Sequence, residues 1–315
     1  MLTVSVGHPE LVVGLQAVLT PAQLARLRLV LWDLRGPLPD GVRPADVDVV
    51  VVPNYSTGPD ALGRLRDLPG LRVLQLPSAG FEHAVPFLPE GVTLCNGRGV
   101  HDAGTAELAV ALVLASQRGV DDAARAMTDG RWAPVPRSSL ADRRVMVLGH
   151  GSVGSAVTRR LEVFEVDVVP VATVARQEGD RHVHGVDELP DLLGGVDVVI
   201  VTLPLTPSTE RLVDAGFLAR MRDGALLVNV GRGKVVDTDA LVAELRAGRL
   251  RAALDVTDPE PLPPGHPLWT APGALITPHV GGYTNATTPR LVDLLRRQVT
   301  ALLDGREPGN VVRPA

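Results

Sequence analysis

Short runs of apolar, often β-branched residues alternate along the chain with stretches of helical spacing. Most of these runs are continuously apolar, which is typical of strands that are covered on both faces. The clearest predicted strands are residues 47–52, 71–76, 145–148, 167–171, 197–201, 225–230, 252–256 and 274–277. This pattern predicts parallel sheets flanked by helices.

The predicted strands form two series, one before about residue 95 and one after residue 145. A long apolar helix is expected between them at 103–117, followed by a polar, proline-containing stretch at 130–137. A second long helix is expected at 288–303. We therefore predict an α/β fold of two doubly wound parallel-sheet domains, the second inserted into the first. The predicted domains are residues 1–98 with 285–315, and residues 99–284.

The composition is that of a globular protein, with 45% apolar and 21% charged residues in 315. A net charge of −5 offers no reason to expect nucleic acid or an anionic membrane as partner. Neither a signal peptide nor an apolar run of ~18 residues is visible. The single Cys95 cannot form an internal disulfide and follows apolar neighbours, so we expect a buried small side chain in a cytoplasmic protein.

The strongest motif is the glycine-rich turn GHGSVG at 149–154, which lies between a predicted strand and a predicted helix. In a Rossmann fold the first glycine makes the tight turn, the second lets the backbone approach a pyrophosphate, and the third allows close packing of helix and strand. Gly149, Gly151 and Gly154 fit these roles. The amides of Ser152 and Val153 would then point at the phosphates from the helix N-terminus.

An acidic residue that binds the adenosine ribose is expected ~20 residues after this turn. No carboxylate stands where the ribose would be, just after the strand at 167–171, and Asp167 lies at the opposite end of that strand. Arg176 comes after the strand and could pair with a 2′-phosphate, which favours NADP over NAD. The alternative is that Arg176 is a solvated loop cation and that backbone or water holds the ribose.

Three further polar residues follow successive strands of the second series, each in a loop that contains glycine or proline: Arg232, Glu260 and His279. Reduction of a 2-oxo acid needs such a set, because an arginine can hold the carboxylate and polarise the carbonyl while a histidine donates the proton. A glutamate can orient the histidine and raise its pKa. Taken singly, each could be an ordinary solvated or structural side chain.

With these motifs in order, the sequence resembles the D-isomer-specific 2-hydroxyacid dehydrogenase family over nearly its full length. The resemblance rests on GHGSVG at 149–154, LPLT at 203–206, NVGRG at 229–233, Asp255 with Glu260-Pro261, and Pro278-His279. It implies a Rossmann cofactor domain inserted into a flavodoxin-like substrate domain.

The resemblance also implies a role for each matching residue. Arg232 would bind the substrate, His279 would be the acid/base, and Glu260 would be its partner. Ser78, Ala79 and Gly80 match the substrate loop, whose amides grip the carboxylate. Thr105-Ala106-Glu107 matches the start of the hinge helix. The implied cofactor-binding residues are Gly149, Gly151, Ser152, Val153, Gly154, Arg176, Leu203, Pro204, Val230, Gly231, Arg232, Asp255, His279 and Gly281.

Differences between this sequence and the motifs of related dehydrogenases narrow the expected cofactor and activity. Ala172 stands where the family's NAD-selecting acid falls, which again favours NADPH, with NAD still possible. Formate dehydrogenases carry a glutamine in place of Glu260, and phosphite dehydrogenases a lysine in place of Ala79. Arg98 and His101 could line the substrate pocket or serve as capping or surface residues.

We therefore expect reduction of a small 2-oxo acid, such as glyoxylate or hydroxypyruvate, to the D-2-hydroxy acid by a homodimer without metal. A phosphoglycerate dehydrogenase is disfavoured because no regulatory domain follows residue 315. A nucleotide-sensing corepressor of the same fold is the alternative, and the absence of long polar extensions argues against it.

Overall fold

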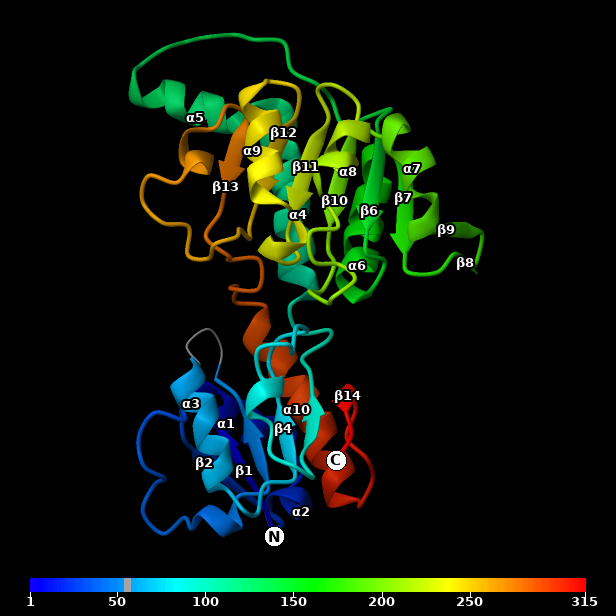
Figure 1. Ribbon diagram of the computed structural model, residues 1–315. Coiled ribbons are helices and arrows are strands. Elements are labelled where there is room, and N and C mark those ends of the chain that lie inside the picture. Colours follow the sequence, from blue (N-terminus) through cyan, green and yellow to red (C-terminus); the bar gives the residue numbers. More distant parts are fainter. Residues whose placement is uncertain (54–57) are drawn as a thin grey trace. The chain divides into compact units, whose positions relative to one another are not determined.

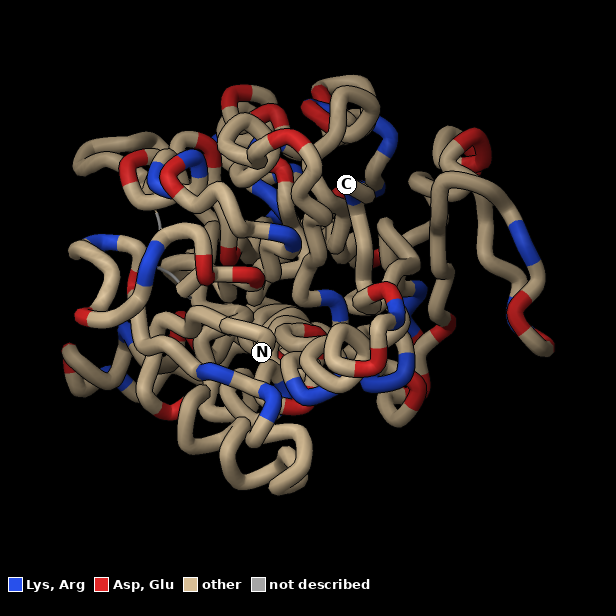
Figure 2. The backbone as a smooth tube through the Cα atoms, turned by 90° about the horizontal axis from the view of Figure 1, so that it is seen from below, with Lys and Arg blue, Asp and Glu red and all other residues tan. Residues whose placement is uncertain are grey.

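The computed structural model describes residues 1–53 and 58–315, which divide into two compact units (Figure 1). Unit 1 comprises Met1–His101 and Asn285–Ala315, and unit 2 comprises Asp102–Thr284. Each unit is built on its own sheet, with helices on both faces. The prediction of two α/β parallel-sheet domains is thereby confirmed. Acidic and basic residues are interspersed along the backbone (Figure 2).

Unit 1 holds a six-stranded sheet in the order β14-β5-β4-β3-β1-β2. Its strands are β1 (Leu2–Val6), β2 (Leu27–Leu31), β3 (Val49–Val51), β4 (Val73–Gln75), β5 (Thr93–Cys95) and β14 (Val311–Arg313). The first five are parallel and follow the flavodoxin-like order 2-1-3-4-5, whereas β14 pairs with β5 in the antiparallel direction.

The alternation of side chains along β3 shows how the sheet of unit 1 is covered. Val49 and Val51 join the apolar cluster formed with α1 (Pro9–Val18) and α10 (Thr287–Leu303), while Val50 joins the cluster on the opposite face. The remaining helical segments of this unit are α2 (Pro21–Leu24), α3 (Pro59–Gly63), η1 (Pro44–Asp46), η2 (Arg64–Asp67) and η3 (Val85–Phe87).

Unit 2 holds an eight-stranded sheet in the order β13-β12-β11-β10-β6-β7-β9-β8. Its strands are β6 (Arg144–Leu148), β7 (Asp167–Ala172), β8 (Arg176–Glu178), β9 (Arg181–Gly185), β10 (Val198–Val201), β11 (Leu226–Asn229), β12 (Arg251–Leu254) and β13 (Ala274–Ile276). With β9 as its third strand, the sheet has the Rossmann order 3-2-1-4-5-6 and changes direction between β6 and β10.

Two groups of helices bury the two faces of this sheet. The first comprises α4 (Asp102–Arg118) and α6 (Ser152–Leu161), which cover Val145 and Val147 of β6. Met146 and Leu148 face the second group. That group contains α7 (Leu189–Leu192), α8 (Ala215–Arg220) and α9 (Thr238–Arg246); the short segments are η4 (Glu162–Phe164), η5 (Val186–Glu188), η6 (Leu193–Gly195), η7 (Gly233–Val235) and η8 (Pro267–Thr270).

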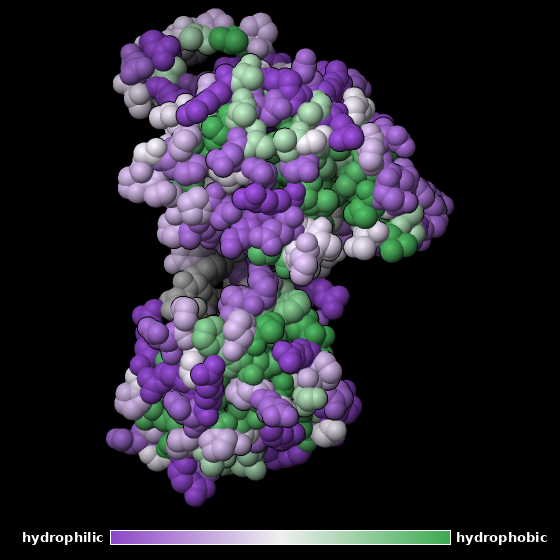
Figure 3. Space-filling view, viewed as in Figure 1, coloured by the Kyte–Doolittle hydropathy of each residue, from purple (hydrophilic) through white to green (hydrophobic). Residues whose placement is uncertain are grey.

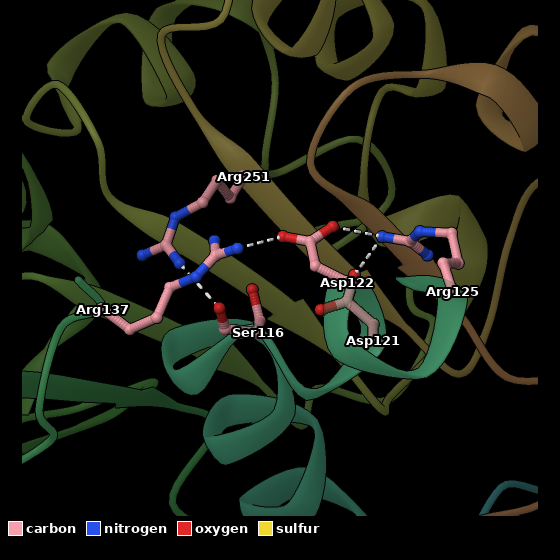
Figure 4. Close-up of polar contacts among 6 residues, drawn as sticks. All are labelled: Ser116, Asp121, Asp122, Arg125, Arg137 and Arg251. Carbon is pink, nitrogen blue, oxygen red and sulfur yellow. Dashed lines mark hydrogen bonds and ion pairs between the residues drawn. The ribbon is translucent and has the colours of Figure 1, made fainter. Parts of the chain in front are cut away.

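An arm, residues 120–143, leaves unit 2 through α5 (Val120–Thr128) and returns in an extended segment (Figure 1). Figure 4 shows the ion pairs at its base: Asp122 accepts hydrogen bonds from Arg125 and Arg137, each at 2.7 Å. Arg251 donates to the carbonyl of Ser116 at 3.1 Å, and burial together with nearby Arg137 lowers its pKa. The extended return segment is therefore fastened to α5.

Each sheet also carries one antiparallel strand: β14 pairs with β5 in unit 1, and β8 pairs with β9 in unit 2. The β8–β9 hairpin at one end of the larger sheet was not predicted (Figure 1). All three residues of β8 are exposed and polar, so it lacks the apolar pattern by which the other strands were found.

Candidate functional site

The glycine-rich turn connects β6 to α6 at the point where the strand order changes direction. Gly149 has φ +107°, which an L-residue rarely adopts. A Cβ at Gly154 would lie 2.0 Å from the carbonyl oxygen of Gly149, so only glycine permits this approach of helix to strand. Thr202 closes the turn from the neighbouring strand by donating to the same oxygen at 2.6 Å.

The turn opens onto a cavity of about 450 Å³. It is lined by Gly149, His150, Gly151, Ala172, Thr173, Val174, Ala175, Arg176, Thr202, Leu203 and Pro204. A Cβ at Gly151 would meet nothing within 4 Å, so this glycine faces open space at the N-terminus of α6. The first-turn amides of a helix have no intrahelical acceptor and attract anions, so the end of the cavity at Gly151 is suited to a phosphate group.

Beyond the end of β7, the side chains of Arg176, Glu178 and His150 lie together. The Arg176 guanidinium donates to Glu178 at 2.7 Å through Nε and to the carbonyl of His150 at 3.2 Å through Nη2. The His150 ring, which is buried, places Nε2 3.2 Å from the other Glu178 oxygen. Arg176 begins β8 and does not lie in a loop, and Glu178 is a carboxylate near the predicted phosphate site that the sequence reasoning missed.

Asp167 opens β7 and pairs with Arg144 at 2.8 Å. As predicted, Asp167 lies at the start of β7, the end away from the expected ribose site. Ala172 is the last residue of β7 and lines the cavity.

His279 and Glu260 form a close pair in unit 2, with His279 Nδ1 2.5 Å from Glu260 Oε1. The hydrogen bond that His279 donates to Glu260 raises the pKa of His279, although burial and the charge of Arg232 oppose this. Burial is the strongest single influence on Glu260 and disfavours its charged form. The hydrogen bond and charge of His279, the Thr257 amide and the charge of Arg232 together outweigh it and lower the pKa of this carboxyl. The pair therefore stabilises imidazolium beside carboxylate, the state in which a histidine can give up a proton.

Asp255 holds the His279 loop in place. Its buried carboxylate accepts hydrogen bonds from the Thr277 hydroxyl at 2.6 Å and from the amides of Val280 and Gly281 at 2.9 Å each. The amide of His279 donates to the Asp255 carbonyl at 2.8 Å, and His279 itself adopts φ +53°. This positioning role was missed, because the sequence analysis assigned Asp255 only to the cofactor.

Arg232 is presented by a turn that the buried Asn229 side chain organises. The Asn229 amide donates to the Arg232 carbonyl at 3.0 Å and its oxygen accepts from the Gly231 amide at 3.0 Å. Arg232 Nη1 donates to the Gly231 carbonyl at 2.8 Å. Arg232 lies near enough to His279 and Glu260 for its charge to lower the pKa of each, so the three predicted catalytic residues lie in one region of unit 2.

The predicted substrate loop, Ser78 to Gly80, follows β4 in unit 1. Its carbonyls are bound by the neighbouring segment: Ser78 accepts from the Gly97 amide at 2.6 Å, and Ala79 accepts from the Asn96 side chain at 2.7 Å. The Ser78 hydroxyl donates to the Gly80 carbonyl at 2.7 Å. These bonds engage the carbonyl groups of the loop and fix its backbone.

Three residues considered from the sequence have defined surroundings. Cys95 is fully buried in β5, and burial raises the pKa of its thiol to about 12, in agreement with a packing role. Arg98 is exposed, and its amide donates to the Asn96 side chain at 3.2 Å. His101 is half-buried at the end of unit 1.

Residues 110–281 match the family model described as D-isomer specific 2-hydroxyacid dehydrogenase, NAD binding domain. A glyoxylate reductase of Thermofilum pendens is 32% identical over 257 residues, which cover 78% of this chain and 75% of that protein. The chain belongs to the D-isomer-specific 2-hydroxyacid dehydrogenase family. It is thus an NAD(P)-dependent oxidoreductase that acts on a CH–OH group, and the resemblance described from the sequence is confirmed.

Two further members of the family support this assignment. The human glyoxylate reductase/hydroxypyruvate reductase is 32% identical over 254 residues, 77% of each chain. The structure of a D-isomer specific 2-hydroxyacid dehydrogenase from Xanthobacter autotrophicus Py2, in complex with NADPH and MES, has a TM-score of 0.83 and 29% identity. It covers 99% of this chain and 98% of its own. Within the described residues, no helix has the length and apolar character needed to cross a bilayer.

Proposed function

We propose that this enzyme reduces a small 2-oxo acid of the glyoxylate or hydroxypyruvate type to the D-2-hydroxy acid, with NADPH as cofactor. The observation that carries the proposal is the His279–Glu260 pair at 2.5 Å, on which the charge of Arg232 also acts. Relatives named glyoxylate reductase support the substrate class. Unit 2 would serve as the cofactor domain and unit 1 as the substrate domain, close to the predicted boundaries.

The residues divide the chemistry as follows. The bound dihydronicotinamide would supply the hydride that reaches the carbonyl carbon. His279 has Nδ1 committed to Glu260, so Nε2 would give its proton to the developing alkoxide. Arg232 would pair with the substrate carboxylate and polarise the adjacent carbonyl. In unit 1, the amides of Ser78, Ala79 and Gly80 would take the carboxylate-binding role that the family resemblance implies.

An absorbance assay of NADPH oxidation over a panel of 2-oxo acids tests this proposal. We expect turnover with glyoxylate or hydroxypyruvate, and in the reverse direction oxidation of D- but not L-2-hydroxy acids. Tight NADPH binding without turnover across the panel would contradict the proposal and favour the nucleotide-sensing alternative.

The preference for NADP is a separate part of the proposal. Ala172 offers no carboxylate to repel a 2′-phosphate, and Arg176 lines the same cavity. The 29% identical structure named above holds NADPH. The remaining predicted contacts would be Leu203 and Pro204 at the adenosine, and Val230, Gly231, Asp255 and Gly281 at the nicotinamide end. A higher kcat/KM with NADH than with NADPH would contradict this preference.

We further propose that the protein is a cytoplasmic homodimer that pairs through the arm, residues 120–143. The arm presents exposed apolar side chains, among them Met127 at 79% and Trp132 at 96%. Figure 3 shows green, hydrophobic atoms on the extended part of the arm at the top of the view, within a mostly hydrophilic surface. Large exposed apolar patches mark interaction surfaces, and the arm gathers several such side chains in one segment.

Light scattering during gel filtration tests the assembly. We expect a dimer that Trp132→Ser weakens and that Trp269→Ser, an exposed tryptophan of η8, leaves unchanged. A monomeric wild-type protein would contradict the proposed homodimer.

A further inference from the structure

A cluster of two histidines and one glutamate lies at the edge of unit 2, away from the residues proposed for catalysis. His182 and His184 stand two residues apart on β9, so both project from the same face of the strand. Val183 between them is fully buried on the opposite face. Glu188 ends the following turn of 3₁₀ helix, η5, which folds back over the strand. A segment of seven residues thus brings three potential metal ligands together.

The geometry of the cluster is close to that of a coordination site. The three ligand atoms all lie within 4.8 Å of one another. His184 Nδ1 is 2.7 Å from Glu188 Oε2, and His182 Nε2 is 3.9 Å from Glu188 Oε1. With bonds of 2.0–2.1 Å in a tetrahedron, ligand atoms are about 3.3 Å apart. Side-chain rotations that change these spacings by about 1.5 Å or less would therefore suffice.

An ordinary ion pair does not account for the whole arrangement. His184 and Glu188 are already within hydrogen-bonding distance of each other. His182 is too far from Glu188 for a hydrogen bond, yet its ring meets that of His184 edge to face at 4.5 Å between centroids. His182 therefore lies in the cluster although the hydrogen bond between His184 and Glu188 forms without it. A shared cation would bind all three.

The carboxylate of Glu188 is fixed by a bond outside the cluster. Its Oε1 accepts a hydrogen bond from the Gly185 amide at 2.8 Å, which orients the group toward the histidines. Such second contacts are what align the ligands of metal sites in proteins. The His182 side chain is 51% exposed, so an ion can enter and a water can complete its coordination.

We propose that His182, His184 and Glu188 bind one divalent transition-metal ion, with zinc as the expected occupant. Two imidazoles and one carboxylate suit Zn²⁺ and its neighbours, whereas Ca²⁺ and Mg²⁺ require oxygen ligands. The ion would tie β9 to η5. Because Val183 of β9 pairs with Arg176 of β8, it would also stabilise the hairpin that carries Arg176. The proposal does not depend on the substrate of the enzyme.

Titration calorimetry with Zn²⁺ on the untagged, chelator-treated full-length chain tests this site. We expect one Zn²⁺ per chain, a higher melting temperature with zinc, and an intense visible absorption band when Co²⁺ is bound instead. His182→Gln is the main variant, because it leaves the hydrogen bond between His184 and Glu188 intact. It should weaken zinc binding at least tenfold and abolish the thermal shift.

His8→Gln is the matched control, since His8 is an exposed histidine of unit 1 that makes no capping hydrogen bond. It should bind zinc as the wild type does. Failure of the wild-type protein to bind zinc would overturn the proposal. Equal binding by the wild type and His182→Gln, or equal losses in His182→Gln and His8→Gln, would also overturn it.

Discussion

Replacing Glu260 by glutamine removes the negative charge beside His279 while keeping a side chain of the same shape. In the reductive direction the enzyme needs protonated His279, so activity is highest at low pH and falls as the pH rises through the pKa of this residue. Glu260 raises that pKa. In Glu260→Gln the fall in activity should therefore move to lower pH.

The magnitude follows from the separation and exposure of the two groups. Unit charges ~4 Å apart attract by about 1 kcal/mol in water and about 4 kcal/mol at an effective dielectric constant of 20. Because the His279 and Glu260 side chains are 47% and 41% exposed, the value should lie near the lower end, about 1 to 2 kcal/mol. This corresponds to a loss of roughly 5- to 30-fold above the His279 pKa.

The assay is the pH profile of kcat/KM for reduction of glyoxylate by NADPH. Rates of wild type and Glu260→Gln should converge toward low pH and diverge as the pH rises. Glu244→Gln is the matched control, because Glu244 forms a comparable pair with Arg249, at 2.6 Å, outside the proposed catalytic residues. An unchanged profile in Glu260→Gln would refute the argument that this carboxylate keeps His279 protonated.

Three further outcomes follow from the structure. Arg176→Ala should raise the KM for NADPH at least tenfold and change the KM for NADH little. Glu178→Gln should lower the KM for NADPH, because it releases Arg176 from its ion pair. Steady-state kinetics that show no cofactor-specific change would contradict this. Asp255→Asn places an amide donor against the backbone donors of Val280 and Gly281, so it should lower the free energy of unfolding by about 1–3 kcal/mol and the melting temperature by several degrees. An unchanged melting curve would argue against the positioning role of Asp255. Gly151→Ala should weaken NADPH binding and leave the melting temperature unchanged, whereas Gly154→Ala should lower the melting temperature. Calorimetry and melting curves that show the same effects for both variants would contradict the assigned glycine roles.

The parts of the fold that could be predicted are those whose residues report burial directly. β10 reads Val-Val-Ile-Val and is buried along its whole length, as expected for a central parallel strand. The hairpin of β8 and β9 could not be found in this way, since a polar edge strand is defined by backbone pairing and not by an apolar pattern.

The same distinction applies to the site. Arg232, Glu260 and His279 stand just after strands, so their grouping in unit 2 follows from the parallel sheet. Arg176 and Glu178 lie two residues apart on β8 and so share one face of it, but the polar sequence of this segment does not indicate a strand. The hydrogen bonds between Asp255 and the His279 loop join residues more than twenty positions apart, which only the folded backbone brings together.

The most direct test of the central proposal is kcat/KM for glyoxylate, with NADPH, in the wild type and in His279→Gln, together with NADPH affinity by calorimetry. If His279 donates the proton to the alkoxide, the substitution should reduce kcat/KM by about 10²- to 10⁴-fold and leave NADPH affinity nearly unchanged. Reduction of glyoxylate by His279→Gln at the wild-type rate would contradict the account.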